Sequence, residues 1–85
     1  MGELADLPNI GKEVERQLIM AGIKSCDQLR STGAQAAWLE IQKIDESACI
    51  HRLYALEGAV LGIKKSLLPK ERKEELKEFY LGHRK

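Results

Sequence analysis

The residues with the clearest chemical potential form a short segment near the N-terminus, Asn9-Ile10-Gly11-Lys12, preceded by Leu7-Pro8. Proline restricts φ, asparagine tolerates the left-handed region and glycine permits close approach, so the segment predicts a tight hairpin leading into a helix. Free N–H groups at a helix start bind anions, and the Lys12 ammonium adds positive charge. We therefore expect contact with a nucleic-acid phosphate. In the alternative interpretation, the turn only joins two elements and Ile10 fills the core.

The distribution of charge places most basic residues at the other end of the chain. The 85 residues have a formal net charge of +1, whereas residues 63–85 alone carry +4 and residues 1–23 carry −2. We expect Lys64, Lys65 and Lys70 to assist the hairpin in binding a phosphate backbone. The alternative is a solvated helix in which opposite charges face each other at i,i+4 spacing.

Enzymatic, metal and membrane functions are not indicated. No serine or cysteine has a recognisable catalytic base, and no glycine-rich nucleotide loop occurs. The two cysteines and two histidines lack metal-ligand spacing, so we expect neither a metal nor another cofactor. No apolar run approaches the roughly 20 residues that span a bilayer, and the acidic N-terminus does not resemble a signal peptide. We therefore expect a cytoplasmic protein without membrane contact.

Hydrophobic periodicity predicts helices throughout and no strands. We expect helices that start near Gly11, Ser25, Gly33, Ala48 and Leu67-Leu68-Pro69. Gly22 and Gly82 are expected to end the first and last of them. The predicted fold class is all-α: one domain over residues 1–85, a compact orthogonal bundle of about five helices.

The predicted central helix, residues 48–63, combines small residues with a carboxylate. Ala55, Gly58, Ala59 and Gly62 recur at helical spacing, and glycine costs about 1 kcal/mol relative to alanine inside a helix. We therefore expect another helix to pack closely here, with a homodimer seam as the alternative. We expect Glu57 to be buried and to accept hydrogen bonds from backbone N–H groups of the hairpin or of a neighbouring helix start.

Several blocks of the sequence together resemble the C-terminal domain of TfoX/Sxy proteins. These blocks are residues 7–12, Gly22-Ile23, Leu29, Gly33-Ala34, Ala37, residues 53–59 and Leu68-Pro69. The resemblance extends from about Leu4 to Leu76, and the hairpin also resembles the helix-hairpin-helix of DNA-binding modules. It implies a bacterial, all-helical domain of the helix-hairpin-helix or SAM-like type, without catalytic residues. Asn9 stands where the usual Gly-hydrophobic-Gly turn has its first glycine, and few residues precede Leu7.

The resemblance also implies a role in natural competence, because full-length TfoX/Sxy proteins regulate it at the level of transcription. In those proteins an N-terminal α/β domain precedes this one, whereas we expect the present chain to be a stand-alone domain. We predict a non-catalytic binding module whose partner is duplex DNA or a transcription-related protein. The alternative is a protein–protein interaction or homodimerisation module with no nucleic-acid contact.

Overall fold

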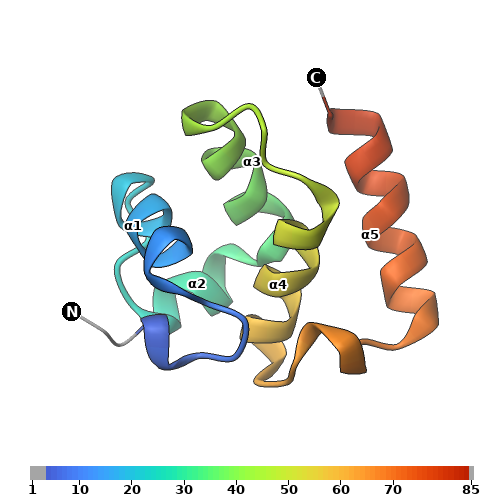
Figure 1. Cartoon of the computed structure of the whole chain (residues 1–85), viewed down its shortest axis with the longest axis horizontal. Coiled ribbons are helices and arrows are strands. Elements are labelled where there is room, and N and C mark those ends of the chain that lie inside the picture. The colour runs from blue at the N-terminus through green and yellow to red at the C-terminus, as the bar shows by residue number, and fades with distance from the viewer. Residues whose placement is uncertain (1–3, 85) are drawn as a thin grey trace.

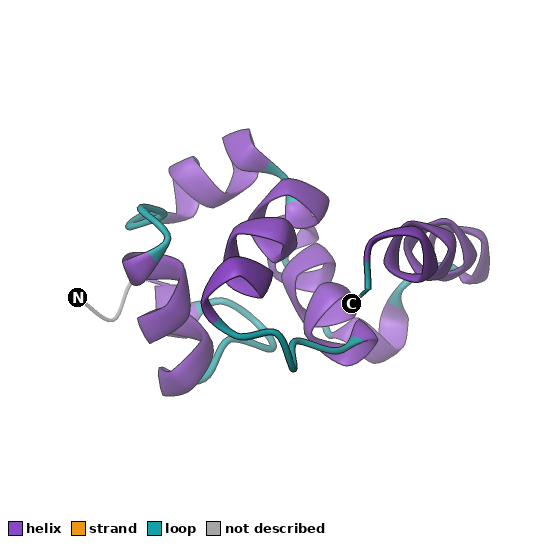
Figure 2. Ribbon diagram, turned by 90° about the horizontal axis from the view of Figure 1, so that it is seen from above, coloured by secondary structure: helices purple, strands orange, loops and turns teal. Residues whose placement is uncertain are grey.

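Five α-helices and two single turns of 3-10 helix make up residues 4–84, the part of the chain that the computed structural model describes (Figure 1). In chain order they are η1 (Leu4–Asp6), α1 (Lys12–Met20), α2 (Cys26–Thr32), α3 (Ala34–Ile44), α4 (Ile50–Leu61), η2 (Lys65–Leu67) and α5 (Lys70–His83). Within this range there is no strand, so the predicted all-α class is confirmed (Figure 2). Residues 1–3 and Lys85, the ends of the predicted domain, lie outside the described residues.

The core lies between α3 and α4, with α1 and α2 on one side and α5 on the other (Figures 1 and 2). Trp38 is fully buried at its centre, and its indole N–H donates to the carbonyl of Cys49 at 3.2 Å. Phe79 and Tyr80 of α5 contact the Trp38 ring edge-on. Apolar residues at helical spacing predict one buried side for α3, and the structure buries all of them: Ala34, Ala37, Trp38 and Ile41.

The end of α1 and the start of α2 follow from local sequence. Gly22 adopts φ +90°, and the N–H of Ile23 donates to the carbonyl of Leu18 at 2.8 Å, which closes α1 as predicted. Ser25 Oγ accepts a hydrogen bond of 3.1 Å from the N–H of Gln28 and so caps α2.

Two other helix boundaries differ from prediction. The central helix begins at Ile50 rather than Ala48, because the Asp45 carbonyl accepts from the N–H of Ala48 and closes a separate turn first. Gly82 lies inside α5 rather than ending it. The helix continues to His83, whose carbonyl accepts a 2.8 Å hydrogen bond from Gln42 Nε2.

A cluster of hydrogen-bonded polar side chains joins α1 to the turn before α4 and to α4 itself. The Gln17 side chain is almost fully buried, and its Nε2 donates to Asp45 Oδ2 at 3.1 Å. One guanidinium nitrogen of Arg52 donates to the same carboxylate oxygen and to Gln17 Oε1, both at 3.1 Å. Hydrogen bonds from Ser47, Arg52 and Gln17 hold the pKa of Asp45 well below its ordinary value. The network fixes where α1 lies and therefore where its start is presented.

Candidate nucleic-acid interface

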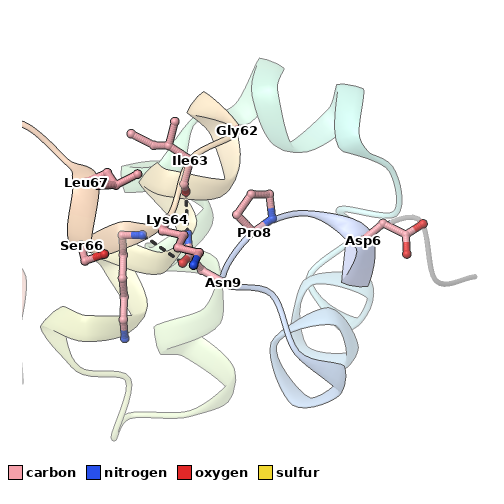
Figure 3. A pocket seen from close by; sticks show the side chains of 9 residues that line it. Asp6, Pro8, Asn9, Gly62, Ile63, Lys64, Ser66 and Leu67 are labelled. Atoms are coloured by element: carbon pink, nitrogen blue, oxygen red, sulfur yellow. Dashed lines mark hydrogen bonds between the residues drawn. The ribbon is translucent and has the colours of Figure 1, made fainter.

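Asn9 joins the hairpin (residues 7–12) to the linker between α4 and α5 (residues 62–69). Its Nδ2 donates to the carbonyls of Ile63 at 2.9 Å and Ala55 at 3.4 Å, while its Oδ1 accepts from the N–H of Lys65 at 2.9 Å (Figure 3). Asn9 has φ +70°, a left-handed conformation that asparagine adopts more readily than most residues. The contacts cross 46–56 residues of sequence, so one amide brings the hairpin against the linker.

Gly58 explains how the hairpin can come so close to α4. A Cβ on residue 58 would lie 2.7 Å from the carbonyl oxygen of Ile63 and would overlap the Asn9 amide. The close approach that this glycine predicted is therefore real. The neighbours are an asparagine side chain and the linker backbone, however, rather than another helix.

Gly62 serves a different purpose from the one predicted. It adopts φ +76° as the C-cap of α4, and a Cβ there would meet nothing within 4 Å. The N–H of Ile63 donates back to the carbonyl of Gly58 at 2.9 Å, which reverses the chain after the helix. Close packing at Gly62 was thus the wrong interpretation, because its role is to turn the linker toward Asn9.

Three of the four small residues named for the alternative homodimer seam lie in the interior of the domain. Ala55, Gly58 and Ala59 are all buried inside the domain, Ala59 completely. A second copy cannot reach these three residues in the folded domain, and of the four small residues only Gly62 is exposed.

The four hairpin residues predicted to bind phosphate divide into two pairs. Asn9 uses its side chain in the linker contact, and Ile10 is buried with its N–H donated to the carbonyl of Leu7 at 3.3 Å. Gly11 and Lys12 are exposed at the start of α1. Among residues 4–84 no side chain caps this helix, and the space beside Gly11 is open. Only Gly11 and Lys12 are therefore available to an anion.

Of the three lysines predicted to assist the hairpin, two line a groove beside it and one does not. Lys64 and Lys65 are exposed and, with Pro8 and Asn9, line an open groove of about 980 Å³ between the hairpin and the linker (Figure 3). Lys70, the first residue of α5, is exposed but does not line this groove. The structure thus places Lys64 and Lys65 beside the hairpin, as the prediction requires.

Two apolar residues of the groove were not anticipated from sequence. Ile63 and Leu67 line the same groove, and Leu67 is 65% exposed. Helical periodicity cannot separate Leu67 from the adjacent Leu68, which is buried, because the linker is not part of a long helix. The only sequence signal for an exposed leucine here is the pair Leu67-Leu68 just before Pro69, where the two side chains cannot both face the core.

Acidic residues near the hairpin make its electrostatic potential less positive. Asp6 is exposed and lines the groove. Glu13 lies in the first turn of α1, where its Oε1 accepts from Arg16 Nε at 3.1 Å. The Arg16 hydrogen bonds lower the pKa of Glu13 and partly neutralise its charge. The negative charge closest in sequence to Lys12 is therefore paired.

Glu57 is buried, as predicted, but its partner is different. Its carboxylate accepts from Arg72 Nε at 2.9 Å and from a terminal guanidinium nitrogen at 3.1 Å, and it raises the pKa of Arg72. The predicted backbone N–H donors were wrong, because a guanidinium satisfies both carboxylate oxygens at once. Arg72 lies in the first turn of α5, so Glu57 holds the start of that helix rather than the hairpin.

Two other kinds of feature are missing from residues 4–84. No group of three or more His, Cys, Asp or Glu side chains in this range could hold a metal ion. No helix in the same range is both long enough and apolar enough to cross a membrane.

Comparison with known proteins places this architecture in a family. The model of the TfoX C-terminal domain matches residues 1–80. Over 76 residues, 89% of this chain, the sequence is 38% identical to Protein Sxy of Escherichia coli (strain K12). It is 33% identical, also over 76 residues, to the DNA transformation protein TfoX of Haemophilus influenzae (strain ATCC 51907 / DSM 11121 / KW20 / Rd). The matched region is 36% and 35% of these relatives, so the chain spans about a third of their length.

Two solved structures match more than nine-tenths of the chain. A crystal structure of an uncharacterised protein from Listeria monocytogenes, in a triclinic form, has 48% sequence identity and a TM-score of 0.92, covering 93% of this chain and 90% of that one. A tetragonal crystal form of a Listeria monocytogenes protein has 47% identity and a TM-score of 0.89, covering 92% and 96%. On the family match and these identities, the chain belongs to the TfoX C-terminal domain family.

Proposed function

We propose that this protein is a non-catalytic module that binds duplex DNA through its phosphate backbone. The observation that carries the proposal is the Asn9 contact, which joins the hairpin leading into α1 to the linker that carries the exposed Lys64 and Lys65. Phosphate binding requires such convergence, because a single helix start or a single lysine holds an anion weakly.

The proposed contacts are few. The N–H groups at the start of α1 and the ammonium of Lys12 meet one phosphate, and Lys64 and Lys65 meet others. Lys70 contributes at the edge of the surface. With about three phosphates neutralised, the logarithm of the binding constant should fall against the logarithm of salt concentration with a slope of about −3. A net charge of +1 adds little general attraction, so affinity at physiological salt should be low.

The relatives support a role in DNA uptake or its regulation. One of them is named a DNA transformation protein. We propose that this chain supplies a binding function of the same kind in a bacterium, in association with competence or with transcription. It corresponds to about a third of those relatives, so it supplies one module of the activity rather than the whole.

Fluorescence anisotropy of a short labelled duplex, at low and at physiological salt, tests this proposal. The double variant Lys64→Glu/Lys65→Glu should lose about tenfold in affinity, and Lys12→Glu a comparable amount. The matched control is Lys24→Glu/Lys77→Glu, which makes the same change in net charge at exposed lysines outside the groove. The control should change affinity by about twofold at most. Equal losses in both double variants, or no salt-sensitive binding by the unmodified protein, would contradict the proposal.

A further inference from the structure

The groove between the hairpin and the linker has an apolar lining that phosphate binding does not use. Pro8, Ile63 and Leu67 contribute this lining, and Leu67 leaves 65% of its surface exposed (Figure 3). Lys64 and Lys65 lie beside them. An exposed apolar surface flanked by charge is typical of a protein-binding site, whereas a phosphate backbone would leave the leucine uncovered.

The groove is held in shape by contacts already described. Asn9 fixes the hairpin wall to the linker wall with hydrogen bonds of 2.9 Å to Ile63 and Lys65. Leu68 is buried in the core directly after η2 and so fixes the position of Leu67. A preformed groove loses little conformational freedom on binding, which favours a ligand that inserts a side chain.

Charge around the groove is arranged asymmetrically. Lys64 lies on one side of Pro8 and Asp6 on the other (Figure 3). A ligand with carboxylates near the lysines gains attraction, whereas carboxylates beside Asp6 would be repelled. The charge pattern therefore favours a negatively charged ligand and sets the direction in which it lies in the groove.

We propose that this groove binds an amphipathic, acidic segment of another protein. A large apolar side chain of that segment packs against Pro8, Ile63 and Leu67, and its carboxylates face Lys64 and Lys65. This binding differs from the proposed DNA binding, because it depends on the apolar lining and does not involve Lys12. The two ligands share Lys64 and Lys65, so they should compete.

The probe is a labelled synthetic peptide of alternating leucine and glutamate pairs, titrated with the full chain and followed by anisotropy. Leu67→Ser should weaken peptide binding about tenfold, and Leu67→Met should retain it. Leu81→Ser is the matched control, because Leu81 is a leucine of similar exposure (48%) that does not line the groove. It should leave peptide affinity unchanged. A peptide with lysine in place of glutamate should not bind.

The same variants measured with duplex DNA separate this inference from the proposed function. Leu67→Ser should change DNA affinity by about twofold at most, whereas Lys12→Glu should weaken DNA binding and leave peptide binding intact. The inference is overturned if the acidic peptide does not bind, or binds Leu67→Ser as well as the unmodified chain. It is also overturned if Leu67→Ser weakens DNA binding as much as peptide binding, because the groove would then be part of the DNA surface.

Discussion

The amide of Asn9 occupies the space that a β-carbon on residue 58 would fill. The two positions are far apart in sequence, yet the hairpin reaches the α4 backbone only because residue 58 is glycine. The same amide binds the carbonyl of Ile63 and the N–H of Lys65, both of which also lie against Gly58. One glycine on the central helix therefore allows the hairpin and the linker to meet.

Gly58→Ala should destabilise the protein although alanine favours helix formation. The added methyl group would lie 2.7 Å from the Ile63 carbonyl oxygen, a backbone atom that cannot move without shifting the linker. We expect a loss of about 2 kcal/mol in the free energy of unfolding. Gly82→Ala is the matched control, because Gly82 is helical and its Cβ would meet nothing within 4 Å. Gly82→Ala should be neutral or stabilising by up to about 1 kcal/mol in urea denaturation. Similar effects at the two sites would contradict this account of Gly58.

Asn9→Gly should remove the amide contacts while still permitting the positive φ. The side chain makes hydrogen bonds to three backbone groups, and each contributes about 1 kcal/mol net. Relief of the left-handed conformation offsets part of this loss, so we expect destabilisation of about 2 kcal/mol and a melting temperature lower by roughly 10 °C. Calorimetry measures both quantities. An unchanged melting temperature would mean that the Asn9 hydrogen bonds do not stabilise the fold and that apolar contacts such as those of Leu7 and Ile10 hold the hairpin.

Glu57→Gln should weaken the attachment of α5 to α4. The substitution preserves shape but removes the charge that Arg72 binds with two hydrogen bonds. Because the Arg72 side chain is one-third exposed, we expect a loss of only about 1–2 kcal/mol. Glu78→Gln, at an exposed site on the same α5 helix as Arg72, is the control and should change thermal stability by less than about 0.5 kcal/mol. If both variants melt at the same temperature as the unmodified protein, the ion pair does not stabilise the fold.

Acid should destabilise the protein partly through Asp45. Its pKa is lowered in the folded state, mainly by hydrogen bonds from Ser47 and further by Arg52 and Gln17. The carboxylate therefore contributes stability that is fully present above its unfolded pKa of about 3.9 and is lost as the pH falls below it. Asp45→Asn should lower stability at neutral pH and flatten its decline below about pH 4. Asp27→Asn, at a 97% exposed side chain, should leave that decline unchanged. Parallel acid unfolding curves for Asp45→Asn and the unmodified chain would refute this role.

Local patterns account for the features that sequence predicted well. The buried side of α3, the glycine end of α1 and the Ser25 cap each depend on residues within one or two turns of one another. The errors concern partners far away in the chain. Sequence indicated that Asn9 could adopt a left-handed turn, but not that its amide would bind residues 63 and 65.

Glu57 shows the same limit. Its burial followed from the apolar helix around it, whereas the choice of Arg72 depends on how α5 crosses α4. The candidate site was likewise half predictable. Exposure of Gly11 and Lys12 follows from the turn, but the groove that adds Ile63 and Leu67 exists only after the linker has folded back.

The most direct test of the central claim is a titration of the ¹⁵N-labelled protein with a short DNA duplex, followed by amide chemical shifts. If the start of α1 and the linker bind the duplex together, the amides of Gly11, Lys12, Lys64 and Lys65 should shift together, and the shifts should diminish as salt rises. Shifts confined to α5, or none at low salt, would contradict DNA binding at this surface.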